Sequence, residues 1–172
     1  MLEIADLIDS KLLIVVFLCE MHSLPRLQFP PYSFKAKNTE KGWVIFDIIR
    51  KKFVLLQPEE WVRQHLIHFL MDQWNISQSL MKVEHKVTTG QINSRFDLAV
   101  FKSDGCVHLL AECKAPTVVL DQKVIHQSLR YCEVLEPDYL FITNGLIHKI
   151  AQLNREDKSY TWLSSINEFQ SR

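Results

Sequence analysis

The sequence lacks an excess of charge of either sign, paired cysteines and a glycine-rich phosphate loop. Its 172 residues carry 20 basic and 20 acidic side chains, so no strongly basic field marks a nucleic-acid binder. Binding to a polyanion would have to come from a local patch or from metal ions. No GxxxxGK[ST] motif occurs, which excludes an ATP-driven motor of the P-loop type from this chain. The cysteines form no CxxC pair, which indicates reduced thiols in a cytoplasmic protein: Cys19, Cys106, Cys113 and Cys132.

A long hydrophobic run is also missing. The apolar stretch KLLIVVFLC, residues 11–19, is far shorter than the roughly 20 residues that span a membrane. Acidic residues precede it, where a secretory signal would have a basic leader. Either residues 1–23 form an extra helix packed on the domain, or the start is assigned too early and Met21 is the first residue. We expect residues 24–172 to form a single domain that does not associate with a membrane.

What is present is a succession of strand-like and helix-like segments. Segments 29–37 and 42–49 alternate like strands around a polar turn and predict an N-terminal β-hairpin. Pro58 and two following acids predict the start of a helix over 58–74, and 120–135 has the pattern of a second amphipathic helix. Strands are expected at 81–87, 138–143, 146–153 and 160–163, together with a central hairpin from Arg95 to Lys114. The pattern predicts an α/β or α+β fold with a mixed central sheet flanked by helices.

The central hairpin carries charges within otherwise apolar strands. Strand side chains alternate between the two faces, so Glu112 and Lys114 share one face of the second strand. If residues 103–106 form a four-residue loop, Lys102 lies opposite Val107 and Asp97 lies opposite Glu112. Directly opposed residues have Cβ atoms about 4.5–5.5 Å apart. The spacing therefore predicts two carboxylates side by side with an amine on the same face.

Two opposed carboxylates among apolar neighbours repel each other and resist desolvation. The free-energy cost of this repulsion and desolvation is a few kcal/mol unless a cation or a shared proton lowers it. A divalent cation with oxygen ligands would do so, and Mg²⁺ commonly takes one or two carboxylates plus waters and phosphate oxygens. On a solvent-facing side of the sheet, however, the same acids need no metal. The hairpin taken alone leaves both interpretations open.

Two further features add to the hairpin. At 100° per residue, Glu59 lies on the same helical face as the apolar residues of its helix, whereas Glu60 points a quarter turn away and is expected to be solvated. Glu59 either joins the acids of the sheet or serves the helix dipole. Gln127 and Tyr131 are four residues apart, hence neighbours on one face of the second helix.

Taken in order, these residues resemble a known family. Glu59, Asp97, Glu112-Cys113-Lys114 and Gln127-x-x-x-Tyr131 follow the order of the PD-(D/E)XK nuclease superfamily, in its branch with the QxxxY motif. The chain is similar above all to the amino-terminal nuclease domain of type I restriction enzyme R subunits, found also as short stand-alone proteins. The similarity covers roughly Leu24 to Leu163 and rests on FPPYSFKAK, IFDIIRKKFVLLQPEEWVRQHLIHFL, RFDLAVF, LLAECKAP and YLFITNG. Phe96 stands where the superfamily name has proline, which is often absent in this branch.

The resemblance implies a restriction-endonuclease-like fold and a Mg²⁺- or Mn²⁺-dependent endonuclease acting on DNA. The metal ligands it implies are the side chains of Asp97, Glu112 and Glu59 and the backbone carbonyl of Cys113. Lys114 would orient or help to deprotonate the attacking water, while Gln127 and Tyr131 would position a phosphate or the lysine. The implied partners are DNA and a helicase, translocase or other restriction subunit.

Two functions remain open from the sequence. The first is metal-assisted hydrolysis of DNA, favoured by the complete set of motif residues. The second is a nucleic-acid-binding or interaction module that keeps the nuclease fold without turnover, favoured by the zero net charge and the missing motor. The lysines between Lys35 and Lys52 either supply a sequence-independent phosphate track or are a solvated strand edge.

Overall fold

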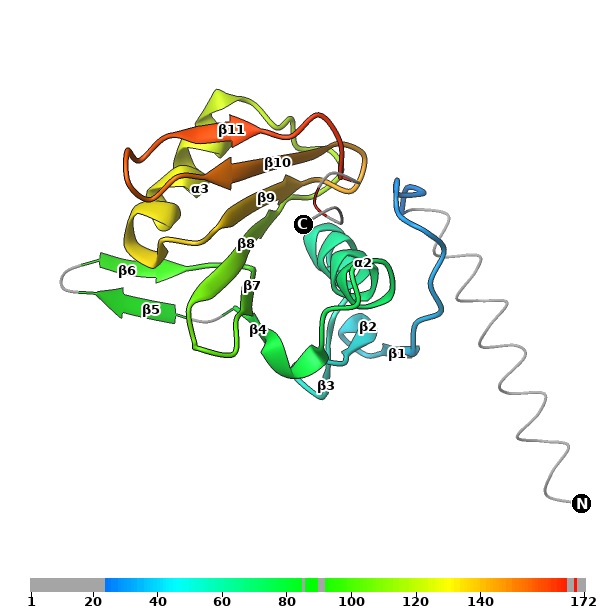
Figure 1. The fold of residues 1–172 in the computed structure, drawn as a ribbon. Helices are drawn as coiled ribbons and strands as arrows, with labels where there is room; N and C mark the ends of the chain where they lie inside the picture. Colours follow the sequence, from blue (N-terminus) through cyan, green and yellow to red (C-terminus); the bar gives the residue numbers. More distant parts are fainter. Residues whose placement is uncertain (1–23, 85, 90–91, 167–168, 170–172) are drawn as a thin grey trace, which may run out of the picture.

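A computed structural model describes residues 24–84, 86–89, 92–166 and 169. The expectations for residues 1–23, with Met21 as an alternative start, fall outside this part of the chain. Within it, a mixed six-stranded sheet lies between two helices, and a smaller sheet adjoins one of them (Figure 1). The predicted fold class, a mixed sheet flanked by helices, is confirmed.

The six-stranded sheet has the order β11-β10-β9-β8-β7-β4, in which β8 and β9 are parallel and all other neighbours are antiparallel. Strand β9 is buried along its whole length, as its continuous apolar sequence YLFIT predicts. The strands are β4 (Met81–Val83), β7 (Leu98–Phe101), β8 (Val107–Cys113), β9 (Tyr139–Thr143), β10 (His148–Leu153) and β11 (Tyr160–Trp162). A short 3-10 helix, η2 (Gln78–Leu80), precedes β4.

Helices α2 (Pro58–Asp72) and α3 (Gln122–Leu135) cover opposite faces of this sheet (Figure 1). Alternate residues of β8 divide between two core clusters: Leu109 and Ala111 pack with α2, and Leu110 packs with α3. Both helices agree with the sequence prediction. Within the described residues, no helix combines the length and the apolar character that crossing a membrane requires.

The N-terminal sheet differs from the predicted hairpin in two ways: residues 29–35 are not a strand, so the first strand begins only at Ala36, and a third strand is present. Strands β1 (Ala36–Thr39), β2 (Gly42–Asp47) and β3 (Lys52–Leu55) form an antiparallel sheet beside α2 (Figure 1). Ile45 of β2 is fully buried, and Val54 of β3 packs against the same cluster. The sequence KFVL lacks the alternation of polar and apolar residues that marks a half-buried strand, because Phe53 and Leu55 are apolar although they are exposed on either side of Val54.

The single strand expected at 81–87 is two strands. Strand β4 ends at Val83, and Glu84 has φ +49°, a left-handed conformation that interrupts a β ladder. Strand β5 (Lys86–Thr89) then pairs with β6 (Ile92–Arg95) in a separate two-stranded sheet. Arg95 therefore ends β6, and the first strand of the central hairpin begins at Leu98.

The register of the central hairpin agrees with the prediction at Leu98 and Ala111, the pair next to the charged residues. Leu98 is paired with Ala111, and one further step along this register places Asp97 opposite Glu112. The prediction for the loop end is wrong. A bulge between Val100 and Phe101 shifts the pairing, so that Val107 lies opposite Phe101 rather than Lys102.

Candidate active site

Asp97 and Glu112 come together at the end of the β7–β8 ladder. Asp97 lies in the bend directly before β7, and its Oδ2 accepts a 2.7 Å hydrogen bond from the backbone N–H of Cys113. This bond ties the bend to the last residue of β8. The two carboxylates are close enough that the charge of Asp97 raises the pKa of Glu112, second only to burial.

Lys114 balances part of this negative charge. Its Nζ lies 2.6 Å from Oε1 of Glu112, and the side chains are 20% and 10% exposed. Burial lowers the pKa of Lys114, but the hydrogen bond and charge of Glu112 outweigh it, so the pKa is raised and the amine stays charged. The backbone N–H of Lys114 donates to the carbonyl of Thr143, which extends the β8–β9 pairing. The amine is thus held at the carboxyl ends of two parallel strands.

Glu59 joins the site through an arginine that the sequence reasoning missed. Nη2 of Arg63 lies 3.0 Å from Oε1 of Glu59 and 3.0 Å from Oδ1 of Asp97. The side chain of Arg63 is only 3% exposed, and its pKa is raised because the charge of Asp97 and other carboxylates outweighs burial. The available signal was its position: Arg63 is four residues after Glu59 and next to Val62, so one helical face carries both.

The expectation that Glu60 is solvated is wrong. Glu60 is 6% exposed, and its two carboxylate oxygens lie 2.7 Å from Arg50 and 2.6 Å from Arg63. Arg50, in the turn between β2 and β3, also contacts Asp47 and Glu84. The smaller sheet lies against the start of α2 (Figure 1), so Glu60 contacts the partly buried Arg50 and the buried Arg63 rather than water.

These contacts form an ionic network around Arg50 and Arg63, and the Lys114–Glu112 pair adjoins it through the hydrogen bond between Cys113 and Asp97. Together they form a cluster of six carboxylates and three cations, which carries more negative than positive charge: Asp47, Glu59, Glu60, Glu84, Asp97 and Glu112 against Arg50, Arg63 and Lys114. In Glu59, as in Glu112, burial and then the charge of Asp97 raise the pKa. The acids around Asp97 are therefore not fully neutralised by the protein's own cations.

Gln127 and Tyr131 lie apart from this cluster. Gln127 is exposed on α3, and its Nε2 is 3.5 Å from the hydroxyl of Tyr131, which packs against the α3-side core. In the described part of the chain, neither residue forms a hydrogen bond to Asp97, Glu112 or Lys114. They do cover the face of the sheet to which Glu112 belongs, because Leu110, two residues before it in β8, packs under α3.

The donors around Asp97 suit a hard divalent cation in type. The carboxylates supply oxygen ligands, and burial raises the pKa of the Cys113 thiol well above its usual value, so only its backbone carbonyl is a ligand for Mg²⁺. Within residues 24–84, 86–89, 92–166 and 169, however, no three His, Cys, Asp or Glu side chains stand together as a ready metal cage. Arg63 pairs with both Glu59 and Asp97, and Lys114 pairs with Glu112. The set fits a cation held by two carboxylates, a carbonyl and water or phosphate oxygens.

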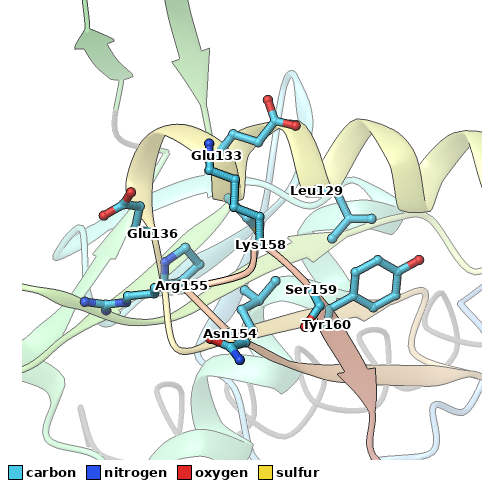
Figure 2. A pocket seen from close by; sticks show the side chains of 11 residues that line it. Leu129, Glu133, Glu136, Asn154, Arg155, Lys158, Ser159 and Tyr160 are labelled. Atoms are coloured by element: carbon cyan, nitrogen blue, oxygen red, sulfur yellow. The ribbon is translucent and has the colours of Figure 1, made fainter.

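A pocket of about 260 Å³ lies elsewhere, between the C-terminal half of α3 and the connection from β10 to β11 (Figure 2). Charged groups of both signs rim it: Glu133, Glu136, Arg155 and Lys158. None of the predicted site residues lines it.

The fold and the cluster define an α/β protein of nuclease-like architecture, with acids and a lysine at adjoining strand ends. The sequence model described as the type I restriction enzyme R protein N terminus (HSDR_N) matches residues 58–167. The chain belongs to this family, and the predicted resemblance to the amino-terminal domain of R subunits is confirmed.

Among solved structures, the chain is similar to a fragment described as an HsdR subunit of a type I restriction enzyme from Vibrio vulnificus YJ016. The identity is 18% and the TM-score 0.45, over 64% of this chain and 23% of that chain. No curated protein matches the sequence.

Proposed function

We propose that the protein is a metal-dependent phosphodiesterase that cleaves DNA. The observation that carries the proposal is the convergence of Asp97, Glu112 and Lys114 at one end of the β7–β8 ladder, with Glu59 linked to them through Arg63. Membership of the R-subunit family supports it. DNA as substrate and a translocase or other restriction subunit as partner belong to the same proposal, and the cytoplasmic location stays a prediction.

In the proposed mechanism the carboxylates of Asp97 and Glu112 and the backbone carbonyl of Cys113 would hold Mg²⁺ or Mn²⁺. The bound ion supplies Lewis acidity toward the scissile phosphate and lowers the pKa of a coordinated water. Glu59 would be a further carboxylate ligand, directly or through water. The raised pKa values of Glu59 and Glu112 reflect buried, unneutralised charge, which is what a cation would relieve.

Lys114 would act on the nucleophile and on the phosphate. Its amine is protonated and held by Glu112 at 2.6 Å. The ammonium would donate to a phosphate oxygen or orient the attacking water. Gln127 and Tyr131 would position the phosphate of the cleaved strand from α3.

The alternative is a module of nuclease fold that binds without cleaving. It is favoured by the way Arg63 and Lys114 already pair with the acids, leaving no ready cage among the described residues. In that case Arg63 and Lys114 would keep their ion pairs with the acids, and no metal ion would bind in their place.

Incubation of supercoiled plasmid with the purified protein in Mg²⁺ or Mn²⁺ separates the two functions. We expect nicking that Asp97→Asn reduces by at least about a hundredfold. The matched control is Asp104→Asn, in the exposed turn between β7 and β8, which should nick like the native protein. Gln127→Ala should give a smaller loss than Asp97→Asn.

Two results would count against the nuclease. Equal nicking by the native protein and Asp97→Asn would identify a contaminant, and DNA binding without any nicking would support the non-cleaving module. Calorimetric titration with Mn²⁺ provides a readout independent of turnover, because Asp97→Asn should lose the binding heat that Asp104→Asn retains.

A further inference from the structure

The sheet β1–β3 has an outer face that neither core cluster covers. Ile45 and Val54 point inward to the α2-side core, so their strand neighbours point outward. Phe53 and Leu55 on that outer side are 40% and 44% exposed, among the largest exposures of any bulky apolar side chain described. Phe46 completes the outward row and belongs to neither cluster.

The outward side chains form a continuous strip. Phe46 is directly paired with Phe53, and their ring centroids are 5.3 Å apart in an edge-to-face arrangement. On the neighbouring step, Val44 is paired with both Leu55 of β3 and Lys37 of β1. The strip therefore crosses all three strands.

Lysines surround this strip. Nζ of Lys37 lies 4.3 Å from the ring centroid of Phe53. In segment 33–57 the exposed charged residues comprise five lysines and one acid: Lys35, Lys37, Lys41, Lys51 and Lys52 against Glu40. None of the five lysines has an ion-pair partner among the described residues, while Arg50 and Asp47 pair with each other. A chain of zero net charge thus has a local excess of four positive charges on one sheet.

The strip leads to the candidate active site. Arg50, in the turn between β2 and β3, lies 2.7 Å from Glu60, and Arg63 joins Glu60 to Asp97. The exposed Lys51 and Lys52 flank this turn. A strand of nucleic acid on the outer face would therefore approach the acids from the β2–β3 end.

We propose that the outer face of β1–β3 binds single-stranded DNA, with bases stacked on Phe53 and phosphates held by Lys35 and Lys37. Exposed rings and aliphatic groups on a lysine-rich strand surface suit the faces of unpaired bases, which every base presents whatever its sequence. Duplex DNA hides those faces and would contact the lysines alone. The choice of DNA as the polyanion rests on the proposed function, whereas the surface itself does not.

The test measures binding without metal, so that cleavage plays no part. A fluorescein-labelled oligothymidylate of about 12 nucleotides, matching one sheet-sized site, is titrated with the full chain in EDTA and followed by anisotropy. Phe53→Ala should weaken binding about five- to a hundredfold, the range of one lost base stack. The matched control is Tyr160→Ala, because Tyr160 is also 40% exposed and lies on the edge strand β11 at the far side of the molecule.

Two companion measurements sharpen the assignment. Phe53→Ala should change the affinity for a duplex of the same length by less than about twofold, since stacked pairs offer no face to the ring. Lys37→Gln should reduce the slope of log affinity against log salt by about 0.7, one single-strand phosphate contact. The exposed Lys123→Gln on α3 serves as its control.

Equal affinities of Phe53→Ala and Tyr160→Ala for the oligonucleotide would overturn the proposal. So would the absence of binding by the native protein, or a concentration-dependent dimer that Phe53→Ala abolishes, since the face would then serve self-association. If the native protein does not bind the oligonucleotide and Phe53→Ala, but not Tyr160→Ala, lowers the melting temperature, then another part of the chain packs on this face. Asp97→Asn should bind the oligonucleotide like the native protein. If the native protein binds the oligonucleotide but does not nick plasmid in Mg²⁺ or Mn²⁺, the nuclease is refuted and this binding surface is not.

Discussion

Helices α2 and α3 differ in what they bury. Ten of the fifteen residues of α2 are buried, and they include Glu60, Arg63 and Gln64. Helix α3 buries two of its fourteen, Ser128 and Cys132, and otherwise shows a water-exposed side. One helix is enclosed between the six-stranded sheet and the N-terminal sheet, and the other lies on the surface (Figure 1). The enclosed helix therefore supplies Glu59 and Arg63 to the candidate site, beside Asp97, Glu112 and Lys114 from the strands, and the Gln127–Tyr131 pair comes from the exposed helix.

The largest expected effect in this comparison is the loss of Arg63. Arg63→Met should lower the free energy of unfolding by about 3–5 kcal/mol, because Glu59, Glu60 and Asp97 lose their shared buried cation. Urea unfolding followed by circular dichroism measures the change. The control is Arg130→Met on the exposed side of α3, which should stay within about 0.5 kcal/mol of the native protein. A loss below about 1 kcal/mol for Arg63→Met would mean that the acids of α2 need no internal cation.

The contrast also explains how far the sequence was informative. Helix α3 and strand β9 follow from the sequence pattern alone, because α3 has one buried side and β9 is buried throughout. The helical periodicity wrongly predicted that Glu60 faces water. Helix α2 is covered on more than one side, and its second buried side carries charged residues, which the periodicity does not distinguish from an exposed side. Strand β3 helps to cover α2, but its sequence lacks the polar–apolar alternation from which this strand could have been predicted.

Other features depend on contacts that no spacing rule contains. The bulge after Val100 changes the loop pairing without changing the register at Asp97. The positive φ of Glu84 breaks an apparently continuous strand. Arg63 could be suspected from its position four residues after Glu59, but its contact with Asp97 joins residues 34 apart. The roles of the six predicted site residues stay predictions, and the structure groups Asp97, Glu112, Lys114 and Glu59 apart from Gln127 and Tyr131.

An intermediate effect should come from His65, another enclosed residue of α2. Its ring is 6% exposed among Phe29, Tyr32, Phe34 and Trp61, and burial lowers its pKa to about 4. The unfolded chain gains this proton below about pH 6.5, whereas the folded chain gains it only near the lowered pKa. The contribution to stability is therefore complete above pH 6.5 and is lost as the pH falls toward 4, by up to about 3 kcal/mol.

Urea titrations between pH 7 and pH 4.5 measure this loss. His65→Phe keeps an aromatic ring in the cluster and should flatten the decline, while His126→Gln, at an exposed position of α3, should leave it unchanged. An identical decline in His65→Phe would assign the acid sensitivity to other groups.

The smallest expected effect lies at the helix starts, where the two helices differ again. Asp121 caps α3: its Oδ1 accepts hydrogen bonds from the N–H groups of Lys123 and Val124, both at 3.0 Å. Gln57 precedes α2 and makes no side-chain cap, because Pro58 and the ion pairs of Glu59 and Glu60 fix that end. Asp121→Ala should therefore cost about 1 kcal/mol in the free energy of unfolding. Gln57→Ala should change it by less than about 0.5 kcal/mol. Equal losses would mean that the enclosed helix depends on its first turn as much as the exposed one does, and that burial does not replace the cap.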